Sequence, residues 1–163
     1  MISETVTLPN GQVLEIDKVS HPGGAAVTAL DDVGRVCLLR QYRCVFDQWF
    51  WELPAGKIDN QEPPFTTVKR ELVEEAGITA NAWQELGHVI SSPGVFTERV
   101  YLYLARDLSH ETPRQESHEI LEIHWLPLQQ ALEWCYSGKI VDAKTIVGLL
   151  RAQHYLMTES ASR

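Results

Sequence analysis

The feature that most constrains the fold is a helical pattern between residues 65 and 76. Apolar side chains recur there every three or four residues, at Phe65, Val68, Leu72, Val73 and Ala76. Pro63-Pro64 can occupy the first turn of a helix, and Gly77 supplies the left-handed residue that commonly ends one. The pattern predicts an amphipathic helix, which needs another layer to cover its apolar side.

Short β-rich runs fill the first third of the chain and recur after this helix. Strands are expected at residues 4–8, 13–19, 25–30, 35–42, 49–53, 83–90, 100–106 and 119–126. Asn10-Gly11 is a hairpin signal between the first two strands, and residues 31–34 form a turn between the third and fourth, which predicts antiparallel pairing. Pro54-Ala55-Gly56 is expected to end the fifth strand, before a polar loop at residues 57–62.

Two further helices are expected, at about residues 128–136 and 143–156. Strands mixed with separate helices predict an α+β or α/β fold in which helices are layered on a sheet. The 163 residues suit a single domain, residues 1–163, without repeats or linkers.

Composition limits the classes of binding partner and the cellular location that we expect for this chain. The chain carries 22 acidic residues against 14 Lys and Arg, a net charge of −8, which disfavours nucleic acid as a partner. No segment approaches the roughly 20 apolar residues that cross a bilayer, and residues 1–10 lack a secretory leader, so we expect a cytoplasmic protein. Cys37, Cys44 and Cys135 are too scattered for a zinc site or a disulfide framework.

Three carboxylates share one arc of the predicted helix. Glu71, Glu74 and Glu75 lie opposite most of its apolar side chains, in the last turn. Like charges at this spacing cost roughly 0.2–0.5 kcal/mol per pair, and the helix dipole also disfavours anions at this end. A solvated acidic face is one reading of these acids. The other is a site for a hard divalent cation, because Mg²⁺ prefers carboxylate oxygens.

The acids belong to a longer pattern of fixed spacing. Gly56 is followed after five residues by Glu62, and after seven more by Arg70-Glu71-Leu72-Val73-Glu74-Glu75-Ala76-Gly77-Ile78. This pattern resembles the box of the Nudix hydrolase family, Gly-x5-Glu-x7-Arg-Glu-U-x-Glu-Glu-x-Gly-U, in which U is aliphatic. The resemblance implies an αβα sandwich with a mixed β-sheet and an N-terminal antiparallel strand extension.

Within the box, the resemblance implies a metal platform. Glu71 and Glu75 are expected to be the main Mg²⁺ ligands, with Glu74 sharing or supporting them and the carbonyl of Ala55 contributing. Mn²⁺ is the alternative metal. Arg70 lies four residues before Glu74 and is expected to orient it. The implied reaction is hydrolysis of a nucleoside diphosphate linked to another group, in which metal ions neutralise the diphosphate and activate water.

Four segments outside the box resemble the ADP-ribose and nucleotide-sugar pyrophosphatase branch of the family, at residues 39–43, 51–56, 92–99 and 138–145. Arg43 is accordingly expected to contact the diphosphate or the terminal ribose, with a plain ion pair as the alternative. Pro93 marks ADP-ribose-type members, and Arg99 belongs to the same segment, so both are expected to contribute to substrate binding. Trp49 and Trp51 point the same way, and Trp51 is expected either to stack on the nucleobase or to serve as a core or dimer contact.

The catalytic base in this branch often comes from an acidic loop outside the box, which corresponds here to residues 115–120. Ser117 occupies one position where an acid is common, which leaves Glu119 as the better aligned candidate and Glu116 as its neighbour. A box glutamate such as Glu74 is the alternative base. A polar connection without a catalytic role is the other reading of this loop.

The leading expectation is cleavage of ADP-ribose to AMP and ribose 5-phosphate. GDP-mannose or another nucleotide sugar is the alternative substrate, because the short motifs bind only the metal and the diphosphate that these molecules share. A non-catalytic nucleotide-sugar sensor and an enzyme that removes RNA 5′ ends fit less well, because the box is complete and the net charge is −8. Branch members are typically homodimers, so residues 1–24 are expected to contribute to dimerisation.

Overall fold

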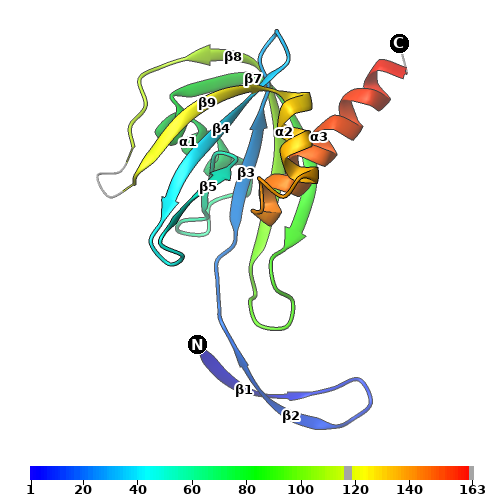
Figure 1. Ribbon diagram of the computed structural model, residues 1–163. Helices are drawn as coiled ribbons and strands as arrows, with labels where there is room; N and C mark the ends of the chain where they lie inside the picture. The colour runs from blue at the N-terminus through cyan, green and yellow to red at the C-terminus, as the bar shows by residue number, and fades with distance from the viewer. Residues whose placement is uncertain (116–118, 162–163) are drawn as a thin grey trace.

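The structure, a computed structural model, describes residues 1–115 and 119–161 (Figure 1). Its strands are β1 (Ile2–Thr7), β2 (Val13–Lys18), β3 (Gly24–Ala29), β4 (Arg35–Arg43), β5 (Gln48–Glu52), β6 (Ala55–Lys57), β7 (Ile78–Ile90), β8 (Arg99–His110) and β9 (Leu121–Pro127). Its helices are α1 (Pro64–Ala76), α2 (Leu128–Tyr136) and α3 (Ala143–Ala161).

Two sheets form the body of the protein. The first has the strand order β6-β3-β8-β7, in which β3 runs parallel to β8 and the other pairs are antiparallel. The second, β5-β4-β9, is antiparallel throughout. Figure 1 shows α1 on one side of these sheets and α2 and α3 on the other. The expected α+β fold, with mixed strands layered between helices, is confirmed.

Strand β3 lies at the centre of the core, since all six of its residues are buried. On one side, Ala25 and Val27 pack in a cluster with Val68 and Leu72 of α1. On the other side, a second cluster joins the sheets to α2 and α3, and includes Leu38, Leu53, Leu104, Leu132 and Leu149. Burial on both sides fixes the ends of β4, β5 and β6 relative to α1 and α3.

Helix α1 forms and ends as the sequence predicts. Pro63 precedes its first residue, and Gly77 ends it with φ of 63° and an N–H that donates to the carbonyl of Val73 at 2.9 Å. The chain then enters β7 directly, five residues earlier than expected, because Ile78 pairs with His110 and so also lengthens β8.

The fifth expected strand, now β5, ends before Pro54 as predicted. The sequence did not predict β6, which Ala55–Lys57 form by pairing antiparallel with residues 24–26 of β3. One expectation about strand pairing was wrong. The third and fourth expected strands, now β3 and β4, do not form a hairpin. Within the described residues a single bridge, Leu30 to Val36, joins them before they enter different sheets.

The N-terminal hairpin stands apart from the body (Figure 1). Strands β1 and β2 pair antiparallel around the expected turn, where the Gly11 N–H donates to the carbonyl of Leu8 at 2.8 Å. Val13 and Leu14 are exposed on this hairpin. The chain then rejoins the body at Val19, whose N–H donates to the carbonyl of Val95 at 2.8 Å.

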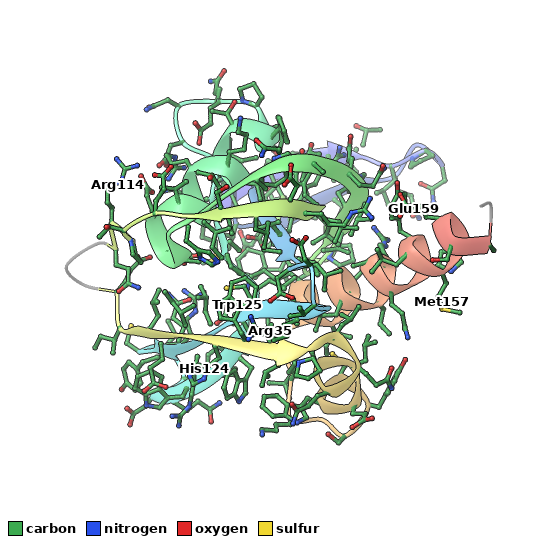
Figure 2. The ribbon with its side chains drawn as sticks, turned by 90° about the horizontal axis from the view of Figure 1, so that it is seen from above. Arg35, Arg114, His124, Trp125, Met157 and Glu159 are labelled. Carbon is green, nitrogen blue, oxygen red and sulfur yellow. The ribbon has the colours of Figure 1, made fainter. Side chains whose placement is uncertain are left out.

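Seen from above, the C-terminal half of α3 extends beyond the sheets, with Met157 and Glu159 near its end (Figure 2). Glu159 pairs with Arg106 of β8 at 2.8 Å, which attaches this part of the helix to the first sheet. None of the helices in the described residues is both long enough and apolar enough to cross a membrane.

Candidate active site

Two of the three acids in the arc of α1 face the protein interior. Glu71 is 9% exposed and Glu75 is 2% exposed, so the solvated-face reading was wrong for these two acids. The side chain of Glu74 is 35% exposed. Strand β6 lies directly against them: the Ala55 N–H donates to Oε2 of Glu75 at 2.8 Å. A Cβ on Gly56 would lie 1.9 Å from the carboxyl carbon of Glu71, so only glycine permits this close approach.

Arg70 holds several of the surrounding acids together. Its guanidinium donates to Glu62 at 2.9 Å, to Glu71 at 2.8 Å and to Glu74 at 3.1 Å. It also reaches the carbonyl of Lys57 in β6 at 3.3 Å. Arg70 therefore links the loop before α1, the helix and β6, and it contacts Glu74 as its position in the sequence predicts.

Burial changes the protonation of the two interior acids. It raises the pKa of Glu75 to about 8, and the charges of Glu71 and Glu119 add to this effect, although the Ala55 N–H opposes it. Burial also raises the pKa of Glu71, with further repulsion from Glu74 and Glu119, against the attraction of Arg70. These carboxylates are thus held close enough to repel one another in a region of low dielectric.

A divalent cation fits this set of donors. Buried carboxylate oxygens that repel one another are stabilised by a hard cation. As the side chains stand, Glu71 contacts Arg70 and Glu75 contacts the Ala55 N–H. In residues 1–115 and 119–161, no group of three or more His, Cys, Asp or Glu side chains is arranged to hold a metal ion.

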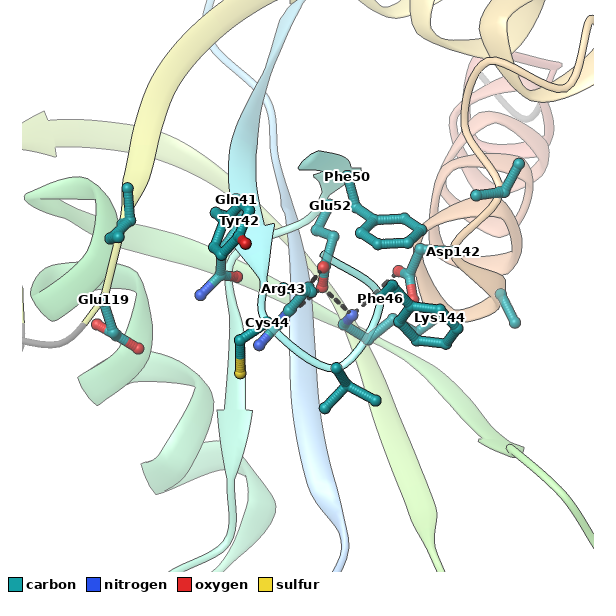
Figure 3. A pocket seen from close by; sticks show the side chains of 14 residues that line it. Gln41, Tyr42, Arg43, Cys44, Phe46, Phe50, Glu52, Glu119, Asp142 and Lys144 are labelled. Atoms are coloured by element: carbon teal, nitrogen blue, oxygen red, sulfur yellow. Dashed lines mark hydrogen bonds and ion pairs between the residues drawn. The ribbon is translucent and has the colours of Figure 1, made fainter. Parts of the chain in front are cut away.

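The loop that follows β8 passes over the end of α1. The Arg114 N–H donates to the carbonyl of Glu74 at 2.9 Å, and the Gln115 side chain donates to the carbonyl of Glu75 at 3.0 Å. Glu119, the better aligned candidate base, lies near the start of β9 on the side of α1 (Figure 3). The other candidate, Glu116, lies outside the described residues, as do Ser117 and His118.

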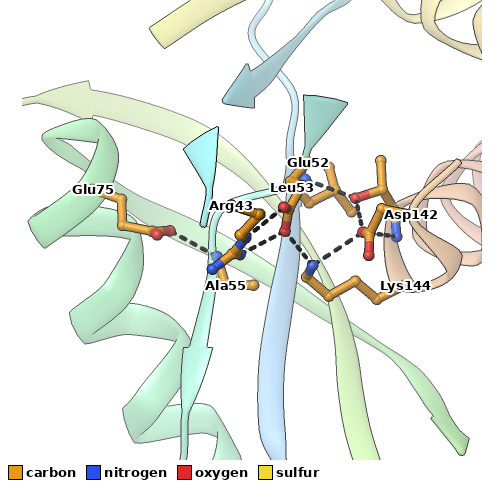
Figure 4. A network of polar contacts seen from close by, with 8 residues as sticks. Arg43, Glu52, Leu53, Ala55, Glu75, Asp142 and Lys144 are labelled. Carbon is orange, nitrogen blue, oxygen red and sulfur yellow. Dashed lines mark hydrogen bonds and ion pairs between the residues drawn. The ribbon is translucent and has the colours of Figure 1, made fainter. Parts of the chain in front are cut away.

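Arg43 lies at the end of β4, where Glu52 of β5 holds it. The guanidinium donates to both carboxylate oxygens of Glu52, each at 2.7 Å (Figure 4). Burial alone would raise the pKa of Glu52, but the hydrogen bonds from Arg43 and the charges of Arg43 and Lys144 outweigh it and lower the pKa to about 2. Glu52 is therefore a buried carboxylate that stays charged.

Two cavities meet at this ion pair. The larger, about 640 Å³, lies between the β4–β5 hairpin and the start of α3, and Phe46 and Phe50 line it with ring centroids 5.4 Å apart (Figure 3). The smaller, about 400 Å³, is lined by Ala55 and Gly56 of β6. Both are lined by Arg43, Asp142, Ala143 and Lys144. The cations of Arg43 and Lys144 thus stand between an aromatic cavity and a cavity beside the acids of α1.

The structure does not bring Trp51 to these cavities. Trp51 packs on Trp134 with ring centroids 5.0 Å apart, in the cluster beneath α2 and α3, which matches the core alternative. Trp49 is on the same face of β5 and lies against Arg40, 5.1 Å from its guanidinium carbon. Phe50 and Glu52 take the opposite face, which lines the larger cavity.

Pro93 and Arg99 lie together at a third, smaller cavity of about 260 Å³. This cavity shares Ile90 and Glu98 with the one beside β6. The cavity of Pro93 and Arg99 therefore adjoins the one beside β6, which Arg43 lines.

Sequence reasoning missed four residues of the site: Phe46, Phe50, Glu52 and Lys144. Glu52 and Lys144 fall inside segments that were noted at residues 51–56 and 138–145, but no role was attached to them. The two phenylalanines carried no local signal, because their grouping depends on the turn between β4 and β5.

Comparison with known proteins gives a consistent result. A family model described as the NUDIX domain matches residues 20–146. The chain is 37% identical to the ADP-ribose pyrophosphatase of Mycobacterium tuberculosis over 159 residues, which cover 95% of this chain and 76% of that protein. It is 29% identical to the GDP-mannose pyrophosphatase of Salmonella typhimurium, over 96% of this chain and 86% of that one. A crystal structure of an ADP compounds hydrolase has the same fold, with a TM-score of 0.81 at 22% identity, over 96% of this chain and 85% of the other.

Proposed function

Because the chain belongs to the Nudix family of hydrolases, we propose that it cleaves the diphosphate bond of ADP-ribose to give AMP and ribose 5-phosphate. One water molecule is consumed: its oxygen bonds to one phosphorus, the bridging P–O bond breaks, and the second phosphate leaves with the bridging oxygen. The 37% identity to an ADP-ribose pyrophosphatase over nearly the whole chain supports this substrate.

The observation that carries the proposal is the position of Arg43. It stands between two cavities, one of them lined by the strand that touches the acids of α1. A substrate made of two bulky groups joined by a diphosphate fits this arrangement, with its charged centre at Arg43 and one group in each cavity. Phe46 and Phe50 suit a nucleobase, because aromatic rings stack on bases.

We assign the metal to the acids of α1. Glu71 and Glu75, supported by Glu74 and the carbonyl of Ala55, would hold Mg²⁺ or Mn²⁺, since their donors are all oxygen. When bound, such an ion neutralises the diphosphate and lowers the pKa of a coordinated water. Arg70 donates to one carboxylate oxygen of Glu71, Oε1, so the other oxygen of this carboxylate would serve the metal while Arg70 orients the group.

Glu119 is the base in this proposal. The charge of Glu119 raises the pKa of both Glu71 and Glu75, the two expected metal ligands, which supports this assignment. Its carboxylate would accept the proton of the attacking water. Arg43 would bind and orient the diphosphate, and Pro93 and Arg99 would contribute from the neighbouring cavity.

GDP-mannose is the second candidate substrate. It shares with ADP-ribose the diphosphate that Arg43 would bind, and a GDP-mannose pyrophosphatase is 29% identical to this chain over most of both sequences. The two substrates differ in the base and the sugar, so the cavities on either side of Arg43 decide between them.

We also propose that residues 1–163 act as one cytoplasmic domain that forms a homodimer through the N-terminal hairpin. A lone two-stranded hairpin is marginally stable in water, so β1 and β2 need a covering partner. Val13 is 67% exposed and Leu14 is 48% exposed there. Deleting residues 1–18 should convert a dimer to a monomer in light scattering, and an unchanged mass would argue against this interface.

The test of the activity is phosphate release coupled to an added phosphatase, which removes phosphate from the monophosphate products. ADP-ribose, GDP-mannose, UDP-glucose and a diadenosine polyphosphate should be compared with and without Mg²⁺. We expect Mg²⁺-dependent turnover with ADP-ribose preferred. A preference for GDP-mannose would make that molecule the proposed substrate in place of ADP-ribose. No turnover of any of the four substrates would refute the proposal.

A further inference from the structure

The segment at residues 138–145 has no role in the function proposed above, yet it reaches the centre of the site. Oδ2 of Asp142 accepts hydrogen bonds from the Thr145 N–H at 3.0 Å and from the Thr145 hydroxyl at 2.5 Å. The same hydroxyl oxygen accepts the Leu53 N–H at 2.8 Å. Thr145 is fully buried. This segment therefore joins the first turn of α3 to the end of β5, one residue beyond Glu52.

Lys144 lies between the two carboxylates of this region. Its Nζ donates to Oε2 of Glu52 at 2.5 Å and to Oδ2 of Asp142 at 3.0 Å. The lysine side chain is 18% exposed and that of Glu52 is 5% exposed. Burial alone would lower the pKa of Lys144, but the two carboxylates outweigh it and raise the pKa, so the ammonium group stays charged.

Glu52 consequently has two cationic partners from two different elements. Arg43 of β4 takes both carboxylate oxygens, and Lys144 of α3 takes Oε2 from the other side (Figure 4). The positive charges of Arg43 and Lys144 balance the negative charges of Glu52 and Asp142. Because a guanidinium binds a carboxylate as a planar fork, the orientation of Glu52 determines the orientation of Arg43.

Arg43 keeps a donor for another group. Glu52 occupies its Nε and one terminal nitrogen, Nη2, whereas the other, Nη1, has no hydrogen bond to any part of the chain that the structure describes. Arg43 lines both cavities and its side chain is 42% exposed. The guanidinium can therefore contact a diphosphate without leaving Glu52.

We propose that Lys144 is a positioning residue for Arg43: through Glu52, it holds the guanidinium between the two cavities, at the orientation that binds the substrate diphosphate. This inference rests on the proposed function, because it takes Arg43 as the diphosphate-binding residue. It gives the segment at residues 138–145 its role, since Asp142 and Thr145 fix the lysine to β5.

The alternative is that Lys144 binds the diphosphate itself, because it also lines both cavities. The geometry favours the indirect role. Two of the three ammonium donors are directed to Glu52 and Asp142, and the side chain is much less exposed than that of Arg43. The two roles predict different results when Lys144 and Arg43 are removed together.

A double-mutant cycle separates these roles. The variants are Lys144→Met, Arg43→Ala and the double variant, and the probe is α,β-methylene ADP-ribose, which is not hydrolysed, titrated calorimetrically with Mg²⁺ present. We expect Lys144→Met to weaken binding about tenfold in the wild-type background. In the Arg43→Ala background the same change should have almost no effect. Equal losses in both backgrounds would overturn the proposal and support direct binding.

Two further variants serve as controls for this double-mutant cycle. Lys139→Met removes another lysine of the segment, whose Nζ lies 3.2 Å from the centre of the Trp134 ring and outside both cavities, so binding should stay at the wild-type level. Lys144→Arg keeps the cation and should recover most of the lost affinity. If thermal unfolding shows that Lys144→Met does not fold, Lys144→Gln takes its place under the same criterion.

The same titration separates this proposal from the activity. Wild-type protein that binds the analogue but hydrolyses no substrate would refute the proposed function, and the cycle would still decide the role of Lys144. Hydrolysis with an additive cycle would overturn the positioning role alone. A wild-type protein that neither binds nor hydrolyses would overturn both.

Discussion

Glu75 gives the sharpest test of the site, because its buried carboxyl is expected to cost stability when no metal is bound. Its pKa rises from 4.5 to about 8 on folding. A carboxyl whose folded pKa is raised contributes stability below pH 4.5, and this contribution is lost as the pH rises through 8. At roughly 1.4 kcal/mol per pH unit, the loss reaches about 5 kcal/mol above pH 8.

Glu75→Gln removes this titration, while its side-chain oxygen can still accept the Ala55 N–H at the position of Oε2. In EDTA, we therefore expect the variant to be more stable than wild type at pH 8, by several kcal/mol, and little different at pH 4.5. With Mg²⁺ it should turn over substrate at least about 100-fold more slowly, because a metal ligand is lost.

The assay is urea unfolding in EDTA at several pH values between 4.5 and 9, for wild type and variant. The difference between the two proteins isolates Glu75 from other titrating groups. Glu74→Gln is the matched control on the same helix, since this acid has a side chain 35% exposed and should leave the pH dependence in place. If the wild-type and Glu75→Gln curves run parallel with pH, the reasoning about burial is refuted.

Three further changes test other parts of the site. Glu119→Gln should lower kcat by about 10²–10⁴-fold at saturating metal, as expected for a lost base, and by more than Glu116→Gln does. Equal, small effects of the two changes would indicate that a glutamate of the Nudix box is the base. Phe46→Ala should raise the KM for ADP-ribose several-fold and alter the preference over GDP-mannose in the coupled assay, because it removes one of two stacking rings. Gly56→Ala should abolish turnover and lower thermal stability, because its methyl group would collide with the carboxyl group of Glu71.

Local signals in the sequence were sufficient for α1 and its acids. The apolar pattern repeats along the 13 residues of the helix, its end depends on the conformation of one glycine, and the spacing of the acids follows from the helix itself. The same information cannot say whether the acids face water or the interior. That depends on β6, a strand of three residues that exists only because it pairs with β3, more than 25 residues earlier in the chain.

The ion pairs that hold Arg43, from Glu52 to Arg43 and from Lys144 to Glu52, could not be predicted from the sequence either. Arg43 and Glu52 are not directly opposite in the β4–β5 ladder, where Arg43 pairs with Gln48 and Leu39 pairs with Glu52. Their side chains meet because both lie on the face that lines the larger cavity, and Lys144 arrives there from a helix 92 residues later in the chain. Motif spacing marked the segments, whereas the contacts depend on how the sheets and α3 pack.

Two buried carboxylates of the site, Glu52 and Glu75, have pKa values shifted in opposite directions, which separates metal binding from substrate binding as the pH changes. Glu52 has a folded pKa of about 2, so its contribution to stability is complete above pH 4.5 and is lost only as the pH falls toward 2. The ion pair between Glu52 and Arg43 should thus stay intact from pH 5 to 9.

Over the same range Glu75 must lose its proton to bind a metal, so the affinity for Mg²⁺ should rise with pH and binding should release protons. Measured at saturating Mg²⁺, the affinity for the methylene analogue should vary little, while the Mg²⁺ concentration needed for half-maximal turnover should fall steeply as the pH rises. A steep change in analogue affinity with a flat metal requirement would contradict the assignment of Glu75 to the metal and Arg43 to the diphosphate.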